Sequence, residues 1–333
     1  MSVFIIAEAG VNHNGSMKIA KQLIDVAVNS GADAVKFQTF NADRQVTHTA
    51  KKARYQEVTT QKSETHYDML RKLELSEEMH VELMAYCHKK NILFLSSPFD
   101  IESVDLLANL GQKCFKVPSG EITNLPYLRH IGRLNNKVIL STGMSNLIEI
   151  KAAINIIESA GTSRDKITTL HCTSEYPLPM SEVNLLAMNS MREEFKTNIG
   201  YSDHTVGIEV AIAAAAMGAS IIEKHFTVNK DLPGPDHKAS LNPAELKLMV
   251  KSIRNIERAL GDGIKKLSAC EIDNMWLVRK SIVAKKEIRV GESFTNENII
   301  AKRPGNGISP MFWDDLIGKK AKKSYSIDEL IEK

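Results

Sequence analysis

With 333 residues, the chain is long for one domain and long enough for a large barrel followed by a small second domain. Its hydrophobic fraction of 43% and charged fraction of 25% are ordinary for globular proteins, which argues against disordered and fibrous classes. The net charge is only +3, and basic residues are interspersed with acidic ones, so the sequence argues against a nucleic-acid-binding protein.

The cysteines and the N-terminal segment indicate a cytoplasmic protein. The four cysteines form no C-x-x-C pair and lie far apart, as expected of reduced thiols rather than a disulfide framework. The first residues, MSVFIIAEAG, lack the basic region of a signal peptide. The longest apolar run, within 210–222, falls short of the roughly 20 residues that cross a bilayer. We therefore expect a soluble protein of the cytosol.

Short apolar segments recur along the first 226 residues and predict strands. Runs without strict alternation, bounded by glycine or polar residues, are typical of strands buried on both faces of a parallel sheet. In chain order the runs are FIIAEAG (4–10), AVKFQ (34–38), ILFLS (92–96), CFKVP (114–118), KVILST (137–142), ITTLHCT (167–173), NIGYSD (198–203) and SIIEKHF (220–226).

The amphipathic segments between these runs predict helices. In 145–161, Asn146 begins a capping motif and Gly161 ends the pattern. In 242–261, Asn242 is followed by proline at the first helical position. Eight strands that alternate with helices predict a (β/α)8 barrel. An open, doubly wound sheet is the alternative, although no G-x-G-x-x-G motif follows the first strand.

The character of the sequence changes after the barrel region. We expect an α/β fold with a TIM barrel in 1–261, a linker in 262–278 and a small domain in 279–333 that has short turns and no long helix. A long insertion, from residue 39 to about residue 63, separates the second strand from its helix. We expect it to be a structureless loop that acts as a lid or binds substrate.

Reactive side chains cluster at the ends of the predicted strands. The carboxyl ends of barrel strands meet at one mouth, where active sites form. Serines there could simply cap the helices that follow, but this does not explain Lys36 and Lys116, because a buried lysine is costly without an anion. The strand-end residues include Glu8, Gln38, Ser97, Ser119, Glu121, Ser141, Ser174, Tyr176 and Ser202.

Lys36 and Lys116, together with these hydroxyls, suggest a cradle for a phosphate and a carboxylate. Phosphoenolpyruvate carries both groups, but these residues alone would equally allow another small phosphorylated acid. Asp236, in the Gly/Pro loop 233–241 after the eighth strand, is a candidate to hold substrate hydroxyls.

His204 and His225 lie at the ends of two consecutive strands, which are neighbours in a barrel. Two imidazoles there could hold one divalent ion with open positions for water and substrate, whereas a structural role for each is the alternative. With no third ligand evident nearby, we expect exchangeable manganese or magnesium rather than structural zinc.

Ten motifs, in order along the whole chain, make this sequence resemble the sialic acid synthase family. They are IAEAGVNHNG (6–15), AVKFQTF (34–40), SSPFD (96–100), KVPSGEI (116–122), ILSTGM (139–144), LHCTSEYP (170–177), GYSDHT (200–205), IEKHFT (222–227), GPDHKASL (234–241) and KRPGNGISP (302–310).

The resemblance implies a metal-dependent barrel, an antifreeze-like (SAF) domain and a domain-swapped homodimer. Residue by residue, it implies metal ligation by His204 and His225, and sugar contacts by Gln38, Tyr176, Asp236 and an Arg303 that reaches across the dimer. Glu8 and Glu121 are candidates for proton transfer. The residues that would bind phosphoenolpyruvate are Lys36, Ser97, Lys116, Ser119, Ser141, Ser174 and Ser202.

The implied reaction joins carbon 3 of phosphoenolpyruvate to the aldehyde carbon of an N-acylated amino sugar, with release of phosphate. Two sugars stay open: N-acetylmannosamine, which gives N-acetylneuraminate, and 2,4-diacetamido-2,4,6-trideoxymannose, which gives N,N′-diacetyllegionaminate. Two other hypotheses are a non-catalytic glycan- or ice-binding protein and a synthase that acts on a phosphorylated aldose. The last would need a second cluster of basic residues for the second phosphate.

Overall fold

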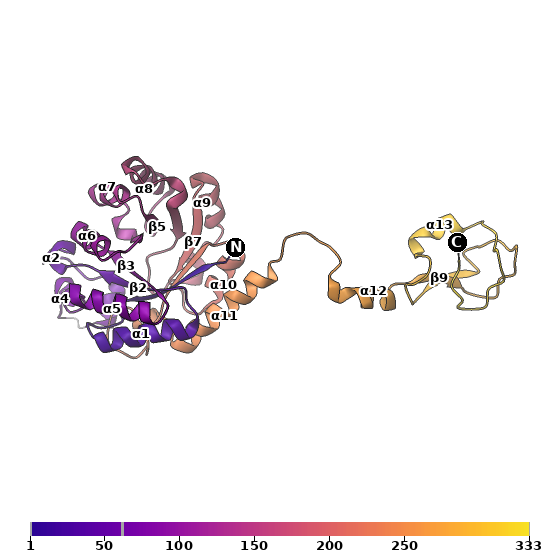
Figure 1. Ribbon diagram of the computed structural model, residues 1–333, viewed down its shortest axis with the longest axis horizontal. Helices are drawn as coiled ribbons and strands as arrows, with labels where there is room; N and C mark the ends of the chain where they lie inside the picture. The colour runs from indigo at the N-terminus through magenta and orange to yellow at the C-terminus, as the bar shows by residue number, and fades with distance from the viewer. Residues whose placement is uncertain (1, 61–62, 333) are drawn as a thin grey trace. The chain divides into compact units, whose positions relative to one another are not determined.

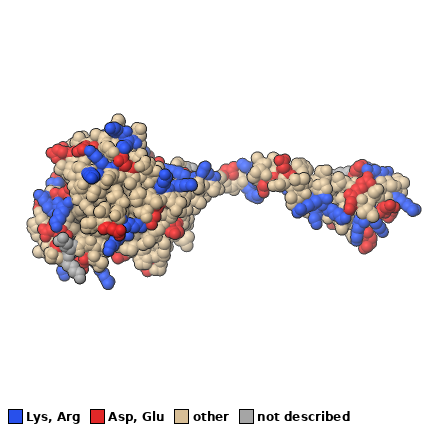
Figure 2. All heavy atoms as spheres, turned by 90° about the horizontal axis from the view of Figure 1, so that it is seen from below, with Lys and Arg blue, Asp and Glu red and all other residues tan. Residues whose placement is uncertain are grey.

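The computed structural model describes residues 2–60 and 63–332, which divide into two compact units, residues 1–261 and 262–333. Figure 1 shows the first unit as strands surrounded by helices. In the described part, no helix is long and apolar enough to cross a membrane. Figure 2 shows lysine and arginine side chains mixed with acidic ones over the face in view, as the interspersed charges predict.

The first unit is a barrel of eight parallel strands, which confirms the predicted fold. The strands follow the order β3-β2-β1-β8-β7-β6-β5-β4, and each lies within two residues of its predicted bounds. They are β1 (Phe4–Gly10), β2 (Ala34–Thr39), β3 (Leu93–Pro98), β4 (Cys114–Val117), β5 (Lys137–Ser141), β6 (Ile167–His171), β7 (Asn198–Asp203) and β8 (Ile221–His225).

Helices cover the outside of this sheet and bury a large apolar cluster against it. As predicted, Asn146 caps α8 and Asn242 caps α11, each through a capping box. The covering helices are α1 (Met17–Ser30), α5 (Glu77–Lys89), α6 (Ile101–Asn109), α7 (Leu125–Arg133), α8 (Leu147–Ala160), α9 (Ala187–Phe195), α10 (Glu209–Ala216) and α11 (Pro243–Ala259).

A glutamine side chain bridges the seam of the barrel. Strands β3 and β4 stand at the two ends of the hydrogen-bonded order but lie next to each other. Gln112, which precedes β4, accepts a hydrogen bond from the backbone N–H of Ser96 and donates one to its carbonyl, both at 2.9 Å. The amide thus replaces the missing strand partner of Ser96 in a buried position.

Replacing Gln112 with leucine should lower the free energy of unfolding by about 2–4 kcal/mol, because two buried backbone groups of Ser96 lose their partners. Urea unfolding followed by circular dichroism at the helix band would measure this. The exposed Gln22→Ala is the matched control and should change stability by less than about 0.5 kcal/mol. A loss below about 1 kcal/mol for Gln112→Leu would show that the bridge is dispensable.

The barrel interior is layered, and this layering places the site. An apolar layer fills the middle of the barrel with Ile6, Ala34, Leu95, Ile139, Leu170 and Ile221. Side chains alternate between the two faces of a strand, so the residues two positions further on also point inward, nearer the mouth. These residues are Glu8, Lys36, Ser97, Ser141, Cys172 and Glu223. The mouth layer is therefore polar.

The long insertion after β2 is not structureless, which corrects that expectation. It contains the short helices α2 (Ala42–Gln45) and α3 (Arg54–Thr59), and α4 (His66–Arg71) follows before α5. Asn41 caps α2, and Thr65 caps α4. These caps supply partners for backbone N–H groups at the helix starts, which allows short helices to form within the insertion. Residues 61 and 62 of this insertion lie outside the described part.

The second unit has its own small core. Strands β9 (Ser281–Ala284) and β10 (Ile299–Lys302) pair antiparallel, and α13 (Trp313–Leu316) is the helix after them. Apolar side chains of this unit, from the two strands and from the loops, pack into one cluster that includes Ile282, Phe294 and Tyr325. The segment expected to be a linker, 262–278, carries α12 (Ile272–Val278).

Candidate active site

A cavity of about 400 Å³ opens at the carboxyl ends of the barrel strands. Both predicted lysines and both predicted histidines line it, together with the serines expected from the sequence. The residues of the sequence-based site that line the cavity are Glu8, Lys36, Gln38, Ser97, Lys116, Ser119, Ser141, Ser174, Tyr176, Ser202, His204, His225 and Asp236.

Two lysines and two glutamates form a buried ionic cluster at the cavity floor. The Nζ atom of Lys36 lies 2.6 Å from Glu8 and 3.6 Å from Glu223, and it donates a 2.8 Å hydrogen bond to Ser97. Lys116 reaches Glu223 at 2.8 Å, on the same carboxylate oxygen that accepts a 3.0 Å hydrogen bond from Ser202. The four charged residues are at most 6% exposed.

The two carboxylates of this cluster differ in proton affinity. Burial, reinforced by the nearby Glu223, raises the pKa of Glu8 to about 7 against the opposing effect of Lys36. Burial also acts to raise the pKa of Glu223, but Lys116 and Lys36 outweigh it and hold that pKa well below its usual range. Glu223 is therefore a fixed anion near neutral pH, whereas Glu8 can carry a proton.

Protonation of Glu8 leaves the cluster with one excess positive charge. Two ammonium groups then face a single ionised carboxylate, in a cavity that also offers several hydroxyls. Charge-assisted hydrogen bonds from such groups suit a phosphate or carboxylate ligand. The floor of the cavity can therefore accept a small anion and store a proton beside it.

The two histidines at the mouth fit a divalent metal ion. The Nδ1 atom of His204 lies 2.6 Å from the carbonyl of Thr173, so it carries the proton and leaves Nε2 as the acceptor. His225 is buried, and its Nδ1 has no hydrogen-bond partner among the described residues. Burial lowers the pKa of both rings, to about 4 for His204, so both are neutral, as metal ligands must be.

The donor set available to such an ion is small. The ring centroids of His204 and His225 are 5.9 Å apart. No group of three or more His, Cys, Asp or Glu side chains that could hold a metal occurs in residues 2–60 and 63–332. An ion here would take two protein ligands and keep further positions for water or substrate. Tyr176 would have to yield, because its hydroxyl lies 3.1 Å from the His204 acceptor nitrogen.

His13 belongs to the same sequence motif as Glu8, but its role is structural. Its side chain is fully buried, its Nδ1 accepts a hydrogen bond from the N–H of Gly15, and it does not line the cavity. Burial lowers its pKa to about 4. The unfolded chain therefore takes up a proton here near pH 6.5 while the folded protein does not, and stability falls as the pH drops below that value.

Between pH 7 and pH 5, His13 should lower the free energy of unfolding by about 2 kcal/mol. The raised pKa values of Glu8 and Asp236 act in the opposite direction over the same range. The measurement is therefore a comparison: urea unfolding at both pH values for the wild type and for His13→Gln. Between pH 7 and pH 5, the wild type should lose about 2 kcal/mol more of its free energy of unfolding than His13→Gln does. Equal losses in the two proteins would contradict the assignment.

Two residues of the sequence-based site, Glu121 and Arg303, do not line the cavity. Glu121 follows β4 but does not line the cavity, and its carboxylate accepts a hydrogen bond from Asn124. Arg303 belongs to the second unit, where it is exposed and its Nε donates to the carbonyl of Val278. Of the two candidate proton carriers, the geometry favours Glu8.

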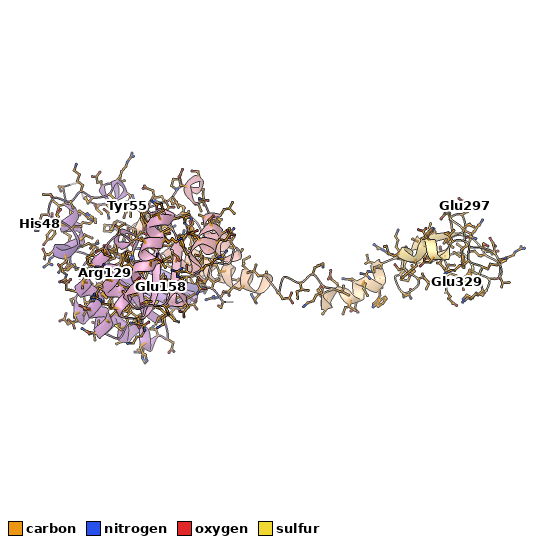
Figure 3. All side chains as sticks on the ribbon, turned by 90° about the horizontal axis from the view of Figure 1, so that it is seen from above. His48, Tyr55, Arg129, Glu158, Glu297 and Glu329 are labelled. Atoms are coloured by element: carbon orange, nitrogen blue, oxygen red, sulfur yellow. The ribbon has the colours of Figure 1, made fainter. Side chains whose placement is uncertain are left out.

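Sequence reasoning missed several residues that line the cavity. Glu223 was visible at the end of β8 but was given no role, although its spacing of two from His225 predicts an inward side chain. Tyr55 of α3 places its ring 5.1 Å from that of Tyr176. Figure 3 labels Tyr55 and His48, which belong to the insertion after β2, and also Arg129 of α7 and Glu158 of α8. No sequence pattern indicates which of the residues in such an insertion face the cavity.

Comparison with known proteins gives consistent results along the whole chain. The NeuB family model matches residues 23–265, and the SAF domain model matches residues 279–333. The chain is 57% identical to the N,N′-diacetyllegionaminic acid synthase of Campylobacter jejuni, over 98% of both chains. It is 47% identical to the synthase of the same name from Legionella pneumophila, over 98% of this chain and 92% of that protein.

Solved structures include similar proteins. The crystal structure of N-acetylneuraminic acid synthetase from Leptospira borgpetersenii, in complex with citrate, superposes with a TM-score of 0.72 at 33% identity. The match covers 83% of this chain and 90% of that one.

Proposed function

Because this chain belongs to the NeuB family and ends in a SAF domain, we propose that it condenses phosphoenolpyruvate with an N-acylated amino sugar, releasing phosphate. The sugar we propose is 2,4-diacetamido-2,4,6-trideoxymannose, and the product is N,N′-diacetyllegionaminate. Similarity to two synthases of that product supports this choice over N-acetylmannosamine.

The observation that carries this proposal is the buried pair of lysines at the cavity floor. Lys36 and Lys116 are held by Glu8 and Glu223 in the ligand-free protein, and they can turn to the phosphate and carboxylate of phosphoenolpyruvate. Hydroxyls of the surrounding serines add further donors. Holding both anionic groups of phosphoenolpyruvate in this way would orient its enol for attack on the sugar, which is chiefly an orientation effect.

Glu8 is the proton donor in this reaction. When carbon 3 bonds to the aldehyde carbon, the aldehyde oxygen gains negative charge and needs a proton. Glu8 can deliver one, because its pKa is raised to about 7. The new bond leaves positive charge at carbon 2 of the former enol, and water adds there and loses one proton. Phosphate then leaves by cleavage of its bond to carbon 2, while the remaining hydroxyl loses its proton and becomes the ketone oxygen.

We further propose that His204 and His225 hold a divalent ion, manganese or magnesium. Such an ion supplies Lewis acidity to a carbonyl oxygen. The neutral, buried imidazoles at matched strand ends support this site. We also propose a domain-swapped homodimer in which the partner's second unit brings its arginine, the equivalent of Arg303, to the sugar.

A phosphorylated aldose is a poor substrate for this cavity. Among the described residues that line it, the lysines are the two of the floor cluster, and no arginine lines it. Within this chain's described lining, a second phosphate would therefore find no cationic side chain beyond the two lysines of the floor cluster. The alternative of a non-catalytic binding protein does not account for the buried ionic cluster or for relatives that are synthases.

Phosphate release from phosphoenolpyruvate tests the proposal. We expect turnover with the diacetamido sugar, slower turnover with N-acetylmannosamine, and none without sugar. Chelation should stop turnover, and added manganese or magnesium should restore it. No phosphate release with either sugar in the presence of metal would refute the proposed function.

A further inference from the structure

The cavity has two chemically different sides. Its floor is the ionic cluster, whereas a hydrophobic patch lies on the side that includes the segment between β2 and α5. Val11, Met69, Leu70, Leu73 and Phe99 line this side and belong to one hydrophobic cluster. An apolar wall of this size offers no partner for sugar hydroxyls and instead suits methyl groups of a ligand.

Four polar residues of the segment between β2 and α5 also line the cavity, namely Gln45, Tyr55, Gln56 and His66, and Gln45 differs from the other three in one respect. The carboxamide oxygen of Gln45 is buried and has no hydrogen-bond partner among the described residues. Of the cavity-lining residues that carry such an atom, Glu8, Glu223 and His225 belong to the ionic cluster and the histidine pair. Gln45 lies outside both, so nothing in the ligand-free site accounts for it. A buried amide oxygen without a partner costs free energy, which a ligand N–H could recover.

Gln45 is held in place by its surroundings. It is the last residue of α2, which Asn41 caps through the N–H of Asp43. The N–H of Ala42 donates to Glu74 at 2.7 Å. Ala42 and Val46, on the same short helix and just after it, pack in the cluster that contains Leu70 and Leu73. The helix that carries Gln45 therefore packs against α4, which carries Leu70.

An acetamido group matches this surface. Its N–H can donate to the Gln45 oxygen, and its methyl group can pack on the leucines beside it. A hydroxyl at the same position could donate to the oxygen but would leave the apolar wall against water or a polar group. The relatives named for N,N′-diacetyllegionaminic acid make a product with two acetylated amines. We assign one of the two N-acyl groups to Arg303, so the other remains to be recognised.

We propose that Gln45, with Leu70 and Leu73, forms the subsite for a second acetamido group, the one on carbon 4 of the sugar. This inference rests on the proposed condensation and names the residues by which the site selects its sugar. The subsite acts on specificity, because N-acetylmannosamine carries a hydroxyl at carbon 4.

Steady-state kinetics with both sugars test the subsite. Gln45→Met keeps the length of the side chain and removes the hydrogen bond. It should lower kcat/KM for the diacetamido sugar about tenfold or more and change kcat/KM for N-acetylmannosamine less than about threefold. The KM for phosphoenolpyruvate should stay unchanged. The exposed Gln22→Ala serves as the matched control and should leave both sugars unaffected.

A second variant guards against an indirect effect of the methionine. Gln45→Glu retains an acceptor oxygen at the same place and should keep more of the activity with the diacetamido sugar than Gln45→Met does. Equal losses with both sugars, or no loss with either, would overturn the subsite while wild-type turnover upholds the proposed function. A wild-type protein that turns over neither sugar would instead overturn the function itself.

Discussion

Replacing Lys116 with methionine should lower kcat/KM for phosphoenolpyruvate about 1,000-fold. The change removes one of the two cations at the cavity floor. It also leaves Glu223, which is only 4% exposed, with Lys36 at 3.6 Å as its remaining cationic partner. The cavity floor would then carry two carboxylates and one lysine, and an incoming anion would be repelled. Phosphate-release kinetics at varied phosphoenolpyruvate would measure the effect.

A second variant separates lost attraction from added repulsion. In Lys116→Met/Glu223→Gln the stranded charge is gone, so part of the loss, about tenfold, should return relative to the single variant. The exposed Lys113→Met is the control for removing a lysine near β4 and should behave as the wild type. Circular dichroism would confirm that each variant is folded. If Lys116→Met kept kcat/KM within about threefold of the wild type, the lysine could not be part of the anion cradle.

The barrel was predictable from the sequence because its signals are local. Continuous apolar runs mark each strand, and β1 and β7 have the bounds that were predicted. Asn146 and Asn242 mark helix starts through interactions within four residues. The position of Lys36 and Lys116 at strand ends likewise predicted that they meet, because the carboxyl ends of parallel strands converge.

Features that depend on the closure of the barrel were not predictable in the same way. Gln112 binds Ser96 across a seam whose location no local pattern indicates. The opposite proton affinities of Glu8 and Glu223 arise from which lysine each one faces after folding. Gln45 reaches the cavity only because short helices shape the insertion. Cap residues such as Asn41 are also common in loops, so the sequence alone does not predict these helices.

The cavity has two sides, and we expect each of them to bind a different substrate. The ionic floor comes from strand residues of the barrel, on a rigid scaffold, and would bind the substrate common to the reaction. The apolar side comes from Val11, Phe99 and apolar residues within 69–73, which follow the insertion after β2, while the insertion itself supplies Gln45. The insertion also contacts the loop before α11 through Thr59 and Pro235. Loops on a barrel can change without disturbing the scaffold, so we infer that sugar selection lies in this insertion.

Mixing two inactive variants should restore activity if Arg303 acts across a dimer. Arg303→Ala alone should lose most sugar-dependent turnover, and Lys116→Met alone lacks the anion cradle. A heterodimer purified through two different tags contains one intact barrel and one intact Arg303, on different subunits. In a domain-swapped dimer these meet, and the heterodimer should show about half the wild-type turnover.

The same mixture has the opposite outcome if each barrel uses its own arginine. The intact barrel would then belong to the subunit that lacks the guanidinium, and the heterodimer would be as inactive as Arg303→Ala. Arg303 is exposed within its own unit, and the backbone carbonyl of Val278 accepts a hydrogen bond from its Nε, so the rest of the guanidinium is available to a ligand. An N-acyl carbonyl suits these donors. Recovery therefore requires that the sugar site be built from two chains, and heterodimers without recovery would exclude the swap.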